Sequence, residues 1–180
     1  MGEVQIGPYD EPAPELARVL RWTRQASVPV SRAVAGERDR VGPLRWQVVW
    51  PLRIIEGEGS TPNNASVVML ARRGDVRMLL TGDIEPAAQR ALLARWRVPQ
   101  VDVLKVAHHG SAYQEQPLLD AARPRVALVS VGADNDYGHP AASTLSALVR
   151  AGAVVGRTDR DGSLAVVGSA TRLRLVTSGG

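Results

Sequence analysis

The sequence contains no cysteine and no phenylalanine, and only three of its 180 residues are histidine. The absence of cysteine excludes disulfide bonds, thiolate zinc sites and cysteine nucleophiles, so any chemistry must use histidine, carboxylate or hydroxyl groups. No run approaches the ~18 consecutive apolar residues of a membrane span, and residues 1–10 do not have the pattern of a signal peptide. The chain itself is therefore expected to be soluble.

Lysine is almost absent as well, since Lys105 is the only one and arginine supplies the remaining basic charge. The net charge of +4 permits attraction to phosphates, although a strong arginine bias is also typical of a GC-rich genome. With 44% hydrophobic and 22% charged residues, the composition indicates a single globular domain over residues 1–180.

Hydrophobic spacing in the first half predicts a helix and then mainly strands. The helix is expected over 12–26, strands over 28–34 and 44–50, a loop over 54–63, and a hairpin of strands over 66–71 and 76–81.

From residue 85 onward, predicted helices alternate with predicted strands, which indicates an α/β layer architecture. Helices are expected over 85–97, 114–122 and 140–151, and strands over 101–107, 125–131, 154–158, 164–167 and 173–176. The last residues, 177–180, are predicted to be a frayed, disordered tail.

The first loop with chemical potential follows the strand over 76–81 and contains Asp83. A carboxylate at the carboxyl end of a strand lies where open α/β sheets bind ligands. The alternative interpretation is that Asp83 caps the helix that follows, which is a common role for aspartate.

The second loop contains two adjacent histidines, His108 and His109, followed by Gly110 and Ser111. Imidazole is a common metal ligand and a physiological acid or base, and glycine lets the backbone approach a ligand closely. Because neighbouring side chains on a strand point to opposite faces, only one of the two histidines is expected to face a site.

The third loop supplies an amide, a phenol and an imidazole within five positions, from Asn135, Tyr137 and His139. The helix that begins near Pro140 would present free backbone N–H groups, which suit a phosphate. An ordinary turn explains the small residues of this loop equally well, but it does not explain Tyr137 and His139 together.

Five segments, in order, resemble the carboxyl-terminal, metallo-β-lactamase-like domain of the ComEC competence proteins: NNASVVML, MLLTGDIE, VDVLKVAHHGS, VSVGADNDYGHP and TDRDGSLAV. The match is strongest over residues 63–167. The resemblance implies an αββα sandwich. Because the superfamily's HxHxDH motif is absent, this chain is expected to be truncated in its N-terminal half and to hold the second half of the sandwich.

The resemblance also assigns roles to individual residues. Asp83 matches the aspartate that bridges two metal ions, and His109, with His108 as the alternative, matches the last histidine ligand. The segment with Asn64 and Ser66 lies where many members carry another histidine, so that ligand is expected to be replaced. The catalytic residues are expected to be Asp83, His109 and His139.

Binding of a phosphodiester is expected from a second group of residues, comprising Lys105, Ser111, Asn135, Tyr137 and His139. The resemblance implies a divalent metal, zinc or manganese, in the full domain, no small-molecule cofactor, and weak or absent metal binding by this chain.

The resemblance therefore implies a metal-dependent hydrolase of a DNA-uptake protein that degrades the non-transported strand and is inactive in this form. The expected partners are DNA, single- or double-stranded, and the remainder of the membrane channel, at the outer face of the cytoplasmic membrane. The competing hypothesis is a non-catalytic DNA-binding or scaffolding module with Arg72, Arg73 and Arg77 as its basic patch. Hydrolysis of a small ester or lactam is a third, less favoured hypothesis.

Overall fold

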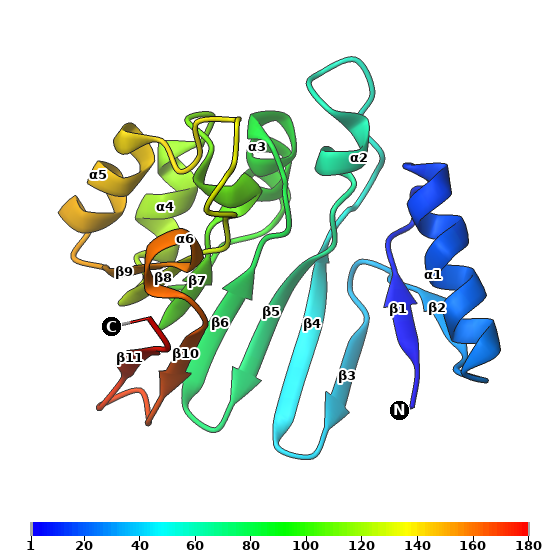
Figure 1. The fold of residues 1–180 in the computed structure, drawn as a ribbon, viewed down its shortest axis with the longest axis horizontal. Coiled ribbons are helices and arrows are strands. Elements are labelled where there is room, and N and C mark those ends of the chain that lie inside the picture. Colours follow the sequence, from blue (N-terminus) through cyan, green and yellow to red (C-terminus); the bar gives the residue numbers. More distant parts are fainter. Residues whose placement is uncertain (1, 180) are drawn as a thin grey trace.

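A seven-stranded mixed sheet forms the centre of the molecule in the computed structural model, which describes residues 2–179 (Figure 1). The strands follow the order β3-β4-β5-β6-β7-β8-β9, antiparallel from β3 to β6 and parallel from β6 to β9. Their bounds are Arg38–Val41, Leu44–Trp50, Val68–Arg73, Val76–Leu80, Val103–Lys105, Val126–Val129 and Val154–Arg157.

Helices connect the parallel strands, because a parallel pair needs a crossover whereas an antiparallel pair needs only a tight turn. These helices are α3 (Pro86–Arg95), α4 (Gln116–Ala122) and α5 (Ala142–Arg150). The predicted hairpin is present as β5 and β6, and Gly74 in its two-residue turn has a φ of +59°. A glycine with positive φ is what such a short hairpin turn requires.

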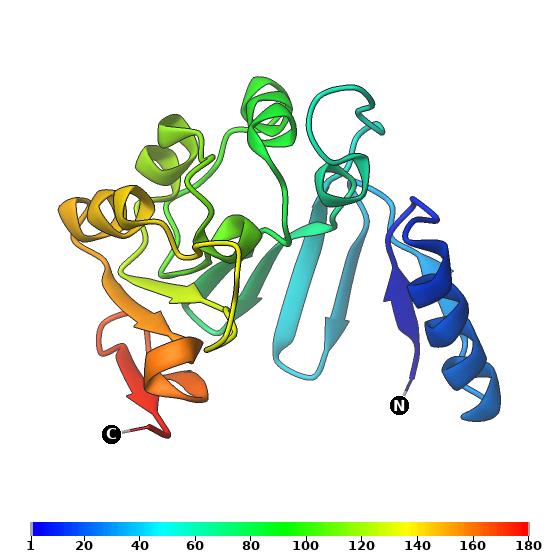
Figure 2. The same cartoon turned by 45° about the horizontal axis from the view of Figure 1, so that its top comes forward.

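Smaller elements flank the central sheet at both ends of the chain (Figure 2). At the amino end, strand β1 (Val4–Ile6) pairs in parallel with strand β2 (Val30–Arg32), and helix α1 (Ala13–Gln25) connects the two strands. At the carboxyl end, β10 (Leu164–Val167) pairs antiparallel with β11 (Arg174–Thr177). Three short helical segments complete the fold: α2 (Thr61–Asn64), η1 (Ala107–Gly110) and α6 (Thr158–Asp161).

The predicted α/β class and metallo-β-lactamase-like architecture are confirmed, with some differences in detail. Strands β1 and β3 were not predicted, and the loop expected over 54–63 gives way to helix α2 at Thr61. The tail expected over 177–180 differs too: Thr177 ends β11 and the Ser178 N–H donates to the Ser163 carbonyl, while residue 180 lies outside the described part. Within residues 2–179, no helix is long and apolar enough to cross a bilayer.

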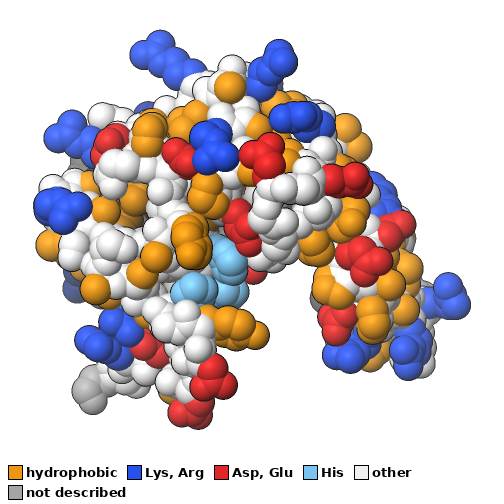
Figure 3. Space-filling model, turned by 90° about the horizontal axis from the view of Figure 1, so that it is seen from above, with side chains coloured by type: hydrophobic (Ala, Val, Ile, Leu, Met, Phe, Trp, Pro, Cys, Tyr) orange, Lys and Arg blue, Asp and Glu red, His pale blue; other side chains and the backbone are white. Residues whose placement is uncertain are grey.

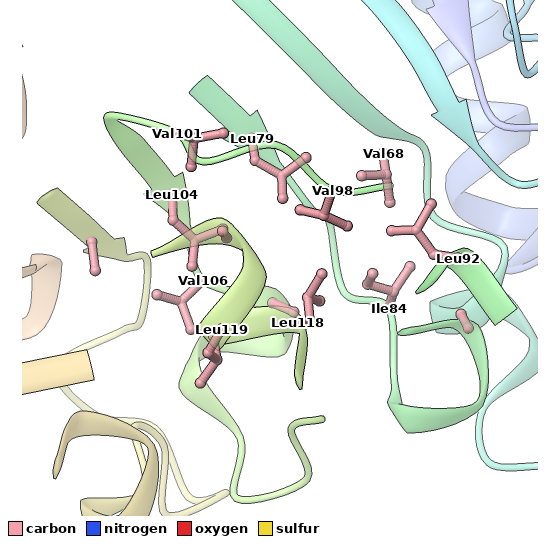
Figure 4. Packing of buried hydrophobic residues seen from close by; sticks show 14 of the residues in the cluster. Val68, Leu79, Ile84, Leu92, Val98, Val101, Leu104, Val106, Leu118 and Leu119 are labelled. Atoms are coloured by element: carbon pink, nitrogen blue, oxygen red, sulfur yellow. The ribbon is translucent and has the colours of Figure 1, made fainter. Parts of the chain in front are cut away.

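The hydrophobic core lies where the parallel strands pack against the crossover helices (Figure 4). Leu79 and Leu104 come from neighbouring strands, and Ile84, Leu92 and Leu118 come from the loop and helices above them. All five side chains are almost completely shielded from solvent. This packing fixes the ends of β6 and β7, and with them the loops that follow.

Replacing Leu104 with alanine should therefore destabilise the fold strongly. Leu104 is 1% exposed, and a buried Leu→Ala change costs about 2–5 kcal/mol through lost transfer energy and a residual cavity. Urea unfolding followed by circular dichroism measures the change. Val154→Ala is the matched control, because Val154 is 58% exposed and its truncation should cost less than about 0.5 kcal/mol. Equal losses in both variants would contradict this description of the core.

Candidate functional site

Three loops meet at one edge of the sheet, where the parallel strands β6, β7 and β8 end. Figure 3 looks onto this edge and shows the three histidines gathered in one recess with acidic side chains beside them. The His108 and His139 rings are 5.4 Å apart, and His109 Nε2 lies 3.3 Å from Asp83 Oδ2. The structure thus brings together Asp83, His108, His109 and His139. Asp83 and His139 are 56 positions apart in the sequence.

Asp83 is held in place by contacts to both its backbone and its carboxylate. Its N–H donates to Ser66 Oγ at 3.1 Å, and Lys105 Nζ donates to its Oδ1 at 3.0 Å. The same ammonium donates to the Gly82 carbonyl at 2.7 Å. Gly82 has a φ of +56°, and an added Cβ would lie 2.6 Å from Ser66 Cβ, so glycine is required for this turn.

The carboxylate of Asp83 is held in its ionised form. Burial by itself raises the pKa of this group, but the Lys105 ammonium and its hydrogen bond, with smaller contributions from His109 and His108, outweigh that effect. The pKa of Asp83 therefore lies below its ordinary value. Ser66 and Lys105, both singled out from the sequence, act here on the aspartate and hold it in the recess.

His109 presents one ring nitrogen to this carboxylate and uses the other to fix its orientation. Its Nδ1 lies 2.6 Å from the Ser130 carbonyl, which can only accept, so Nδ1 carries a proton. In the neutral ring, Nε2 would then turn a lone pair toward Asp83 Oδ2 at 3.3 Å. Two electron-rich atoms in this position would suit a cation between them.

His108 faces the opposite wall of the recess. Its Nδ1 lies 3.7 Å from Glu85 Oε1, is buried, and has no hydrogen-bond partner in the described part of the chain. Its ring neighbours that of His139. Burial, reinforced by repulsion from His108 and His109, lowers the pKa of His139, so that its neutral form is favoured.

The backbone of the second loop explains how two consecutive histidines enter one recess. His108 and His109 have φ values of +45° and +54°, and Gly110 follows with +78°. Left-handed conformations are unfavourable for residues other than glycine, and strained backbone of this kind concentrates at functional sites. A Cβ at Gly110 would lie 2.7 Å from Pro140 Cβ, so the second and third loops are packed directly together.

Asn135 and Tyr137 in the third loop have different surroundings from His139. The Asn135 amide donates to the Gly132 and His139 carbonyls, and its Oδ1 accepts the His139 N–H at 3.1 Å. Tyr137 is 84% exposed, and its ring stacks beside that of His139 at 6.1 Å and 26°. Asn135 thus shapes the loop, whereas Tyr137 is free to contact a ligand outside.

Ser111 and Asn64 point into the protein. Ser111 is 1% exposed, its Oγ accepts the Tyr113 N–H, and its carbonyl accepts a hydrogen bond from Thr144. Asn64 is fully buried and its side chain bonds the Glu58 carbonyl and the Glu85 N–H. These contacts hold the loops together, and Ser111 also lines the cleft that His108 and His139 line.

Glu85 is a wall residue that the sequence analysis did not single out. Its Oε2 accepts the Ser60 N–H and its Oε1 accepts from Asn63 Nδ2, both at 2.9 Å. Gly59 lies so close that an added Cβ would meet this carboxylate at 2.1 Å. The only sequence signal for it is its position two residues after Asp83.

Two amide side chains, the buried Gln89 and the half-buried Gln114, support the histidine loop. Gln114 Nε2 donates to the Ala107 and Ser111 carbonyls, and its Oε1 accepts from Gln89 Nε2 at 3.2 Å. Gln89 is completely buried although it lies on a helix. Nothing in the helical pattern distinguishes it from a surface glutamine, so sequence reasoning could not have found it.

A cleft of about 750 Å³ opens beside the recess. One wall carries Glu58, Glu85 and Arg90, and the other carries His108, Tyr137 and His139. The cleft gives an extended ligand access to the two imidazoles of the second wall.

Comparison with known proteins identifies the family. ComE operon protein 3 of Bacillus subtilis is 30% identical to this chain over 159 residues, which cover 88% of the chain and 20% of that protein. Recombination protein 2 of Haemophilus influenzae is 34% identical over 124 residues, covering 68% of the chain and 15% of that protein. The chain belongs to the ComEC family of competence proteins. No family model matches it.

A solved structure supports the fold of this ComEC-family chain. CmlA, a diiron β-hydroxylase from Streptomyces venezuelae that has the metallo-β-lactamase fold, superposes with a TM-score of 0.50 over 87% of the chain and 38% of CmlA. The identity is 19%, so the likeness concerns the fold alone. The chain spans a fifth or less of the length of the two competence-protein relatives.

The metallo-β-lactamase fold suggests a metal, but the described residues of this ComEC-family chain do not make up a complete site. No group of three or more histidine, cysteine or acidic side chains between residues 2 and 179 is arranged to hold an ion. Asp83 Oδ2 and His109 Nε2 face each other as two ligands of one cation would. The Lys105 ammonium, however, already neutralises the other oxygen of Asp83.

The last matched segment, TDRDGSLAV, anchors the third loop from behind. Thr158 Oγ1 exchanges hydrogen bonds of 2.7 Å with the N–H and the carbonyl of Val131. The Arg157 guanidinium binds both oxygens of Asp159, at 3.1 and 2.5 Å, and both side chains are largely buried. The hydrogen bonds from Arg157 are the main reason that the pKa of Asp159 lies below its ordinary value.

Asp159→Asn should lower stability at pH 7 by about 1–3 kcal/mol, because it removes a charge-assisted pair. Since folding lowers the pKa of Asp159, its stabilisation is present above the ordinary value of about 3.8 and is lost as pH falls through the lowered pKa. The difference between wild type and variant, measured by urea unfolding from pH 7 to pH 3, should therefore shrink toward acid. Asp134→Asn in the exposed loop is the control; a difference for Asp159→Asn that stays constant with pH would contradict the assignment.

Proposed function

We propose that this chain forms one wall of a metal-dependent phosphodiesterase site in a DNA-uptake protein. The convergence of Asp83, His109 and His139 from three loops in one recess carries the proposal. A carboxylate and imidazoles of this kind are the groups that hydrolytic sites use for ligation and proton transfer. The substrate proposed is the DNA strand that is not transported.

The proposed ion is zinc or manganese, with Asp83 and His109 as two of its ligands. His108 is the alternative ligand, but its Nδ1 faces Glu85 and not Asp83. Because further donors are needed beyond the described residues, we expect this chain alone to bind metal weakly and to be inactive. A bound divalent ion would supply Lewis-acid chemistry in the complete domain.

The residues of the chain itself would position and neutralise the phosphodiester. Lys105 holds Asp83 ionised and places a positive charge beside the scissile group, where it would oppose developing negative charge. His139, whose neutral form is favoured, lies on the cleft wall, where its ring would accept a proton from an attacking water or donate an N–H hydrogen bond to the phosphodiester. Tyr137 would contact the strand from its exposed position, while Asn135 and Ser111 would support the loops.

The partners and location follow from the relatives and belong to the proposal. DNA, single- or double-stranded, and the remainder of the membrane channel are the proposed partners, and no small-molecule cofactor is proposed. We place the domain at the outer face of the cytoplasmic membrane. The second candidate function is a DNA-binding or scaffolding module, which is favoured by the incomplete ligand set.

A cleavage assay separates the two functions. The chain should be joined to an upstream segment that carries an HxHxDH motif, and incubated with end-labelled DNA and Mn²⁺ or Zn²⁺. We expect cleavage by the joined protein, at least 100-fold less after Asp83→Ala or His109→Ala, and none by the chain alone.

Arg18→Gln is the matched control, because Arg18 is exposed on α1, away from the recess. Isothermal titration of the chain alone should show metal binding weaker than micromolar. Cleavage that survives both Asp83→Ala and His109→Ala would remove the site assignment, and metal-independent DNA binding without cleavage would favour the scaffolding module.

A further inference from the structure

Four arginines stand in one row across four neighbouring strands. Arg40 of β3 lies directly opposite Arg45 of β4, Arg45 opposite Arg72 of β5, and Arg72 opposite Arg77 of β6. Residues directly opposite in a sheet point to the same face, so the four guanidinium groups emerge side by side. We call Arg40, Arg45, Arg72 and Arg77 the arginine row.

The arginine row lacks the carboxylates that would neutralise it. Like charges directly opposite each other destabilise a sheet, and natural strands usually alternate the two signs. The ion-pairing arginines in the described residues are Arg32, Arg90, Arg125 and Arg157, none of which belongs to the row. Four facing cations that make no ion pair within residues 2–179 form a surface that attracts anions.

The few polar contacts around the row leave its guanidinium groups available. Arg72 Nε donates to the Gly74 carbonyl at 2.9 Å, and Arg77 Nη1 lies 3.5 Å from the Gln100 carbonyl. The nearest carboxylates are engaged with backbone, since Asp39 accepts the Arg40 N–H and Asp102 accepts the Arg77 N–H. All four arginines of the row are exposed.

The row lines a hollow of about 1040 Å³. Arg38 adds a fifth guanidinium to the lining of this hollow and Asp39 adds one carboxylate, so the lining stays net positive. Adjacent strands lie about 4.8 Å apart, so four arginines span about 14 Å. A stacked single strand, with one phosphate every ~3.4 Å, presents about four phosphates over that length.

We propose that the arginine row binds the phosphate backbone of a single nucleic-acid strand. Single-strand binding proteins use positively charged grooves of this kind to track a flexible backbone. An anionic bilayer surface fits less well, because a planar headgroup layer cannot enter a hollow. The identification of the anionic ligand as a nucleic acid rests on the proposed function. The attraction of the row for an anion does not, because it follows from the four facing arginines.

The arginine row is separate from the histidine recess. It lies near the hairpin turns at one end of β3 to β6, whereas the three loops lie at the other end of the sheet (Figure 1). Asp83 follows Arg77 by six positions, which corresponds to at most about 20 Å of chain. A strand bound by the row would be held by this domain without occupying the recess.

Fluorescence anisotropy of a labelled oligo(dT) with the 180-residue chain, in EDTA, tests the proposal. Arg45→Gln/Arg72→Gln removes the two central cations of the row, and Arg18→Gln/Arg21→Gln removes the same charge from exposed positions on α1. We expect at least tenfold weaker binding for the row variant and less than twofold for the α1 variant. The slope of log K against log salt should change from about −2.8 to about −1.4 for the row variant.

Several outcomes would overturn the arginine row as a single-strand site. These are equal losses in the two variants, no binding by wild type at 50 mM salt, tighter binding to a duplex of the same length, or preferential binding to phosphatidylserine vesicles. Thermal melts of both variants show that they are folded, and Arg45→Lys/Arg72→Lys should retain most of the affinity. Binding is measured in EDTA and needs neither a metal ion nor cleavage, so failure of the cleavage proposal would leave this result intact.

Discussion

The left-handed turn at the end of β7 is the feature on which the site depends. In a regular strand His108 and His109 would point to opposite faces, and only one could enter the recess. Three successive residues with positive φ bring both rings to the same side, where one meets Asp83 and the other meets Glu85 and His139. Such a backbone costs about 1–3 kcal/mol at each strained residue, and it persists only where its surroundings hold it.

Those surroundings are the buried polar contacts beneath the histidines. The His108 N–H donates to the Gly82 carbonyl, Gln114 binds the carbonyls on either side of the turn, and the Ala141 N–H donates to Gly110. The first bond joins the turn to the loop of Asp83 and the last joins it to the loop of His139, while Gln114 holds the turn from within its own loop. The three loops are therefore one connected structure, and a change in any of them should move the histidines.

Sequence patterns predicted the framework well, because most of its elements carry clear periodicity. The hairpin β5–β6 and the alternation from α3 to β9 follow from apolar spacing, and parallel strand ends explain why Asp83, His109 and His139 converge. Strand β3 was missed because its residues, RDRV, are all exposed and show no apolar face. The inward orientation of Ser111 and Asn64, and the second histidine entering the recess, depend on backbone angles and tertiary contacts that no local pattern encodes.

The two ends of the central sheet have different chemistry. At the carboxyl ends, a few ionisable groups are held in fixed positions by buried hydrogen bonds. Near the hairpin turns, the arginine row is exposed to solvent and makes no ion pair within residues 2–179. The fold thus separates a geometrically specific recess from a surface suited to sequence-independent attraction, and one sheet holds both in fixed relation.

The central claim is that a carboxylate and imidazoles from three loops together attract one cation. Paramagnetic broadening of backbone amide resonances during titration with Mn²⁺ tests it most directly, since weak binding suffices. The account predicts that the amides of Asp83, His109 and His139 broaden together, before those of α1 or β3, and that Asp83→Asn abolishes the effect. Broadening confined to one loop, or scattered over acidic surface residues, would contradict it.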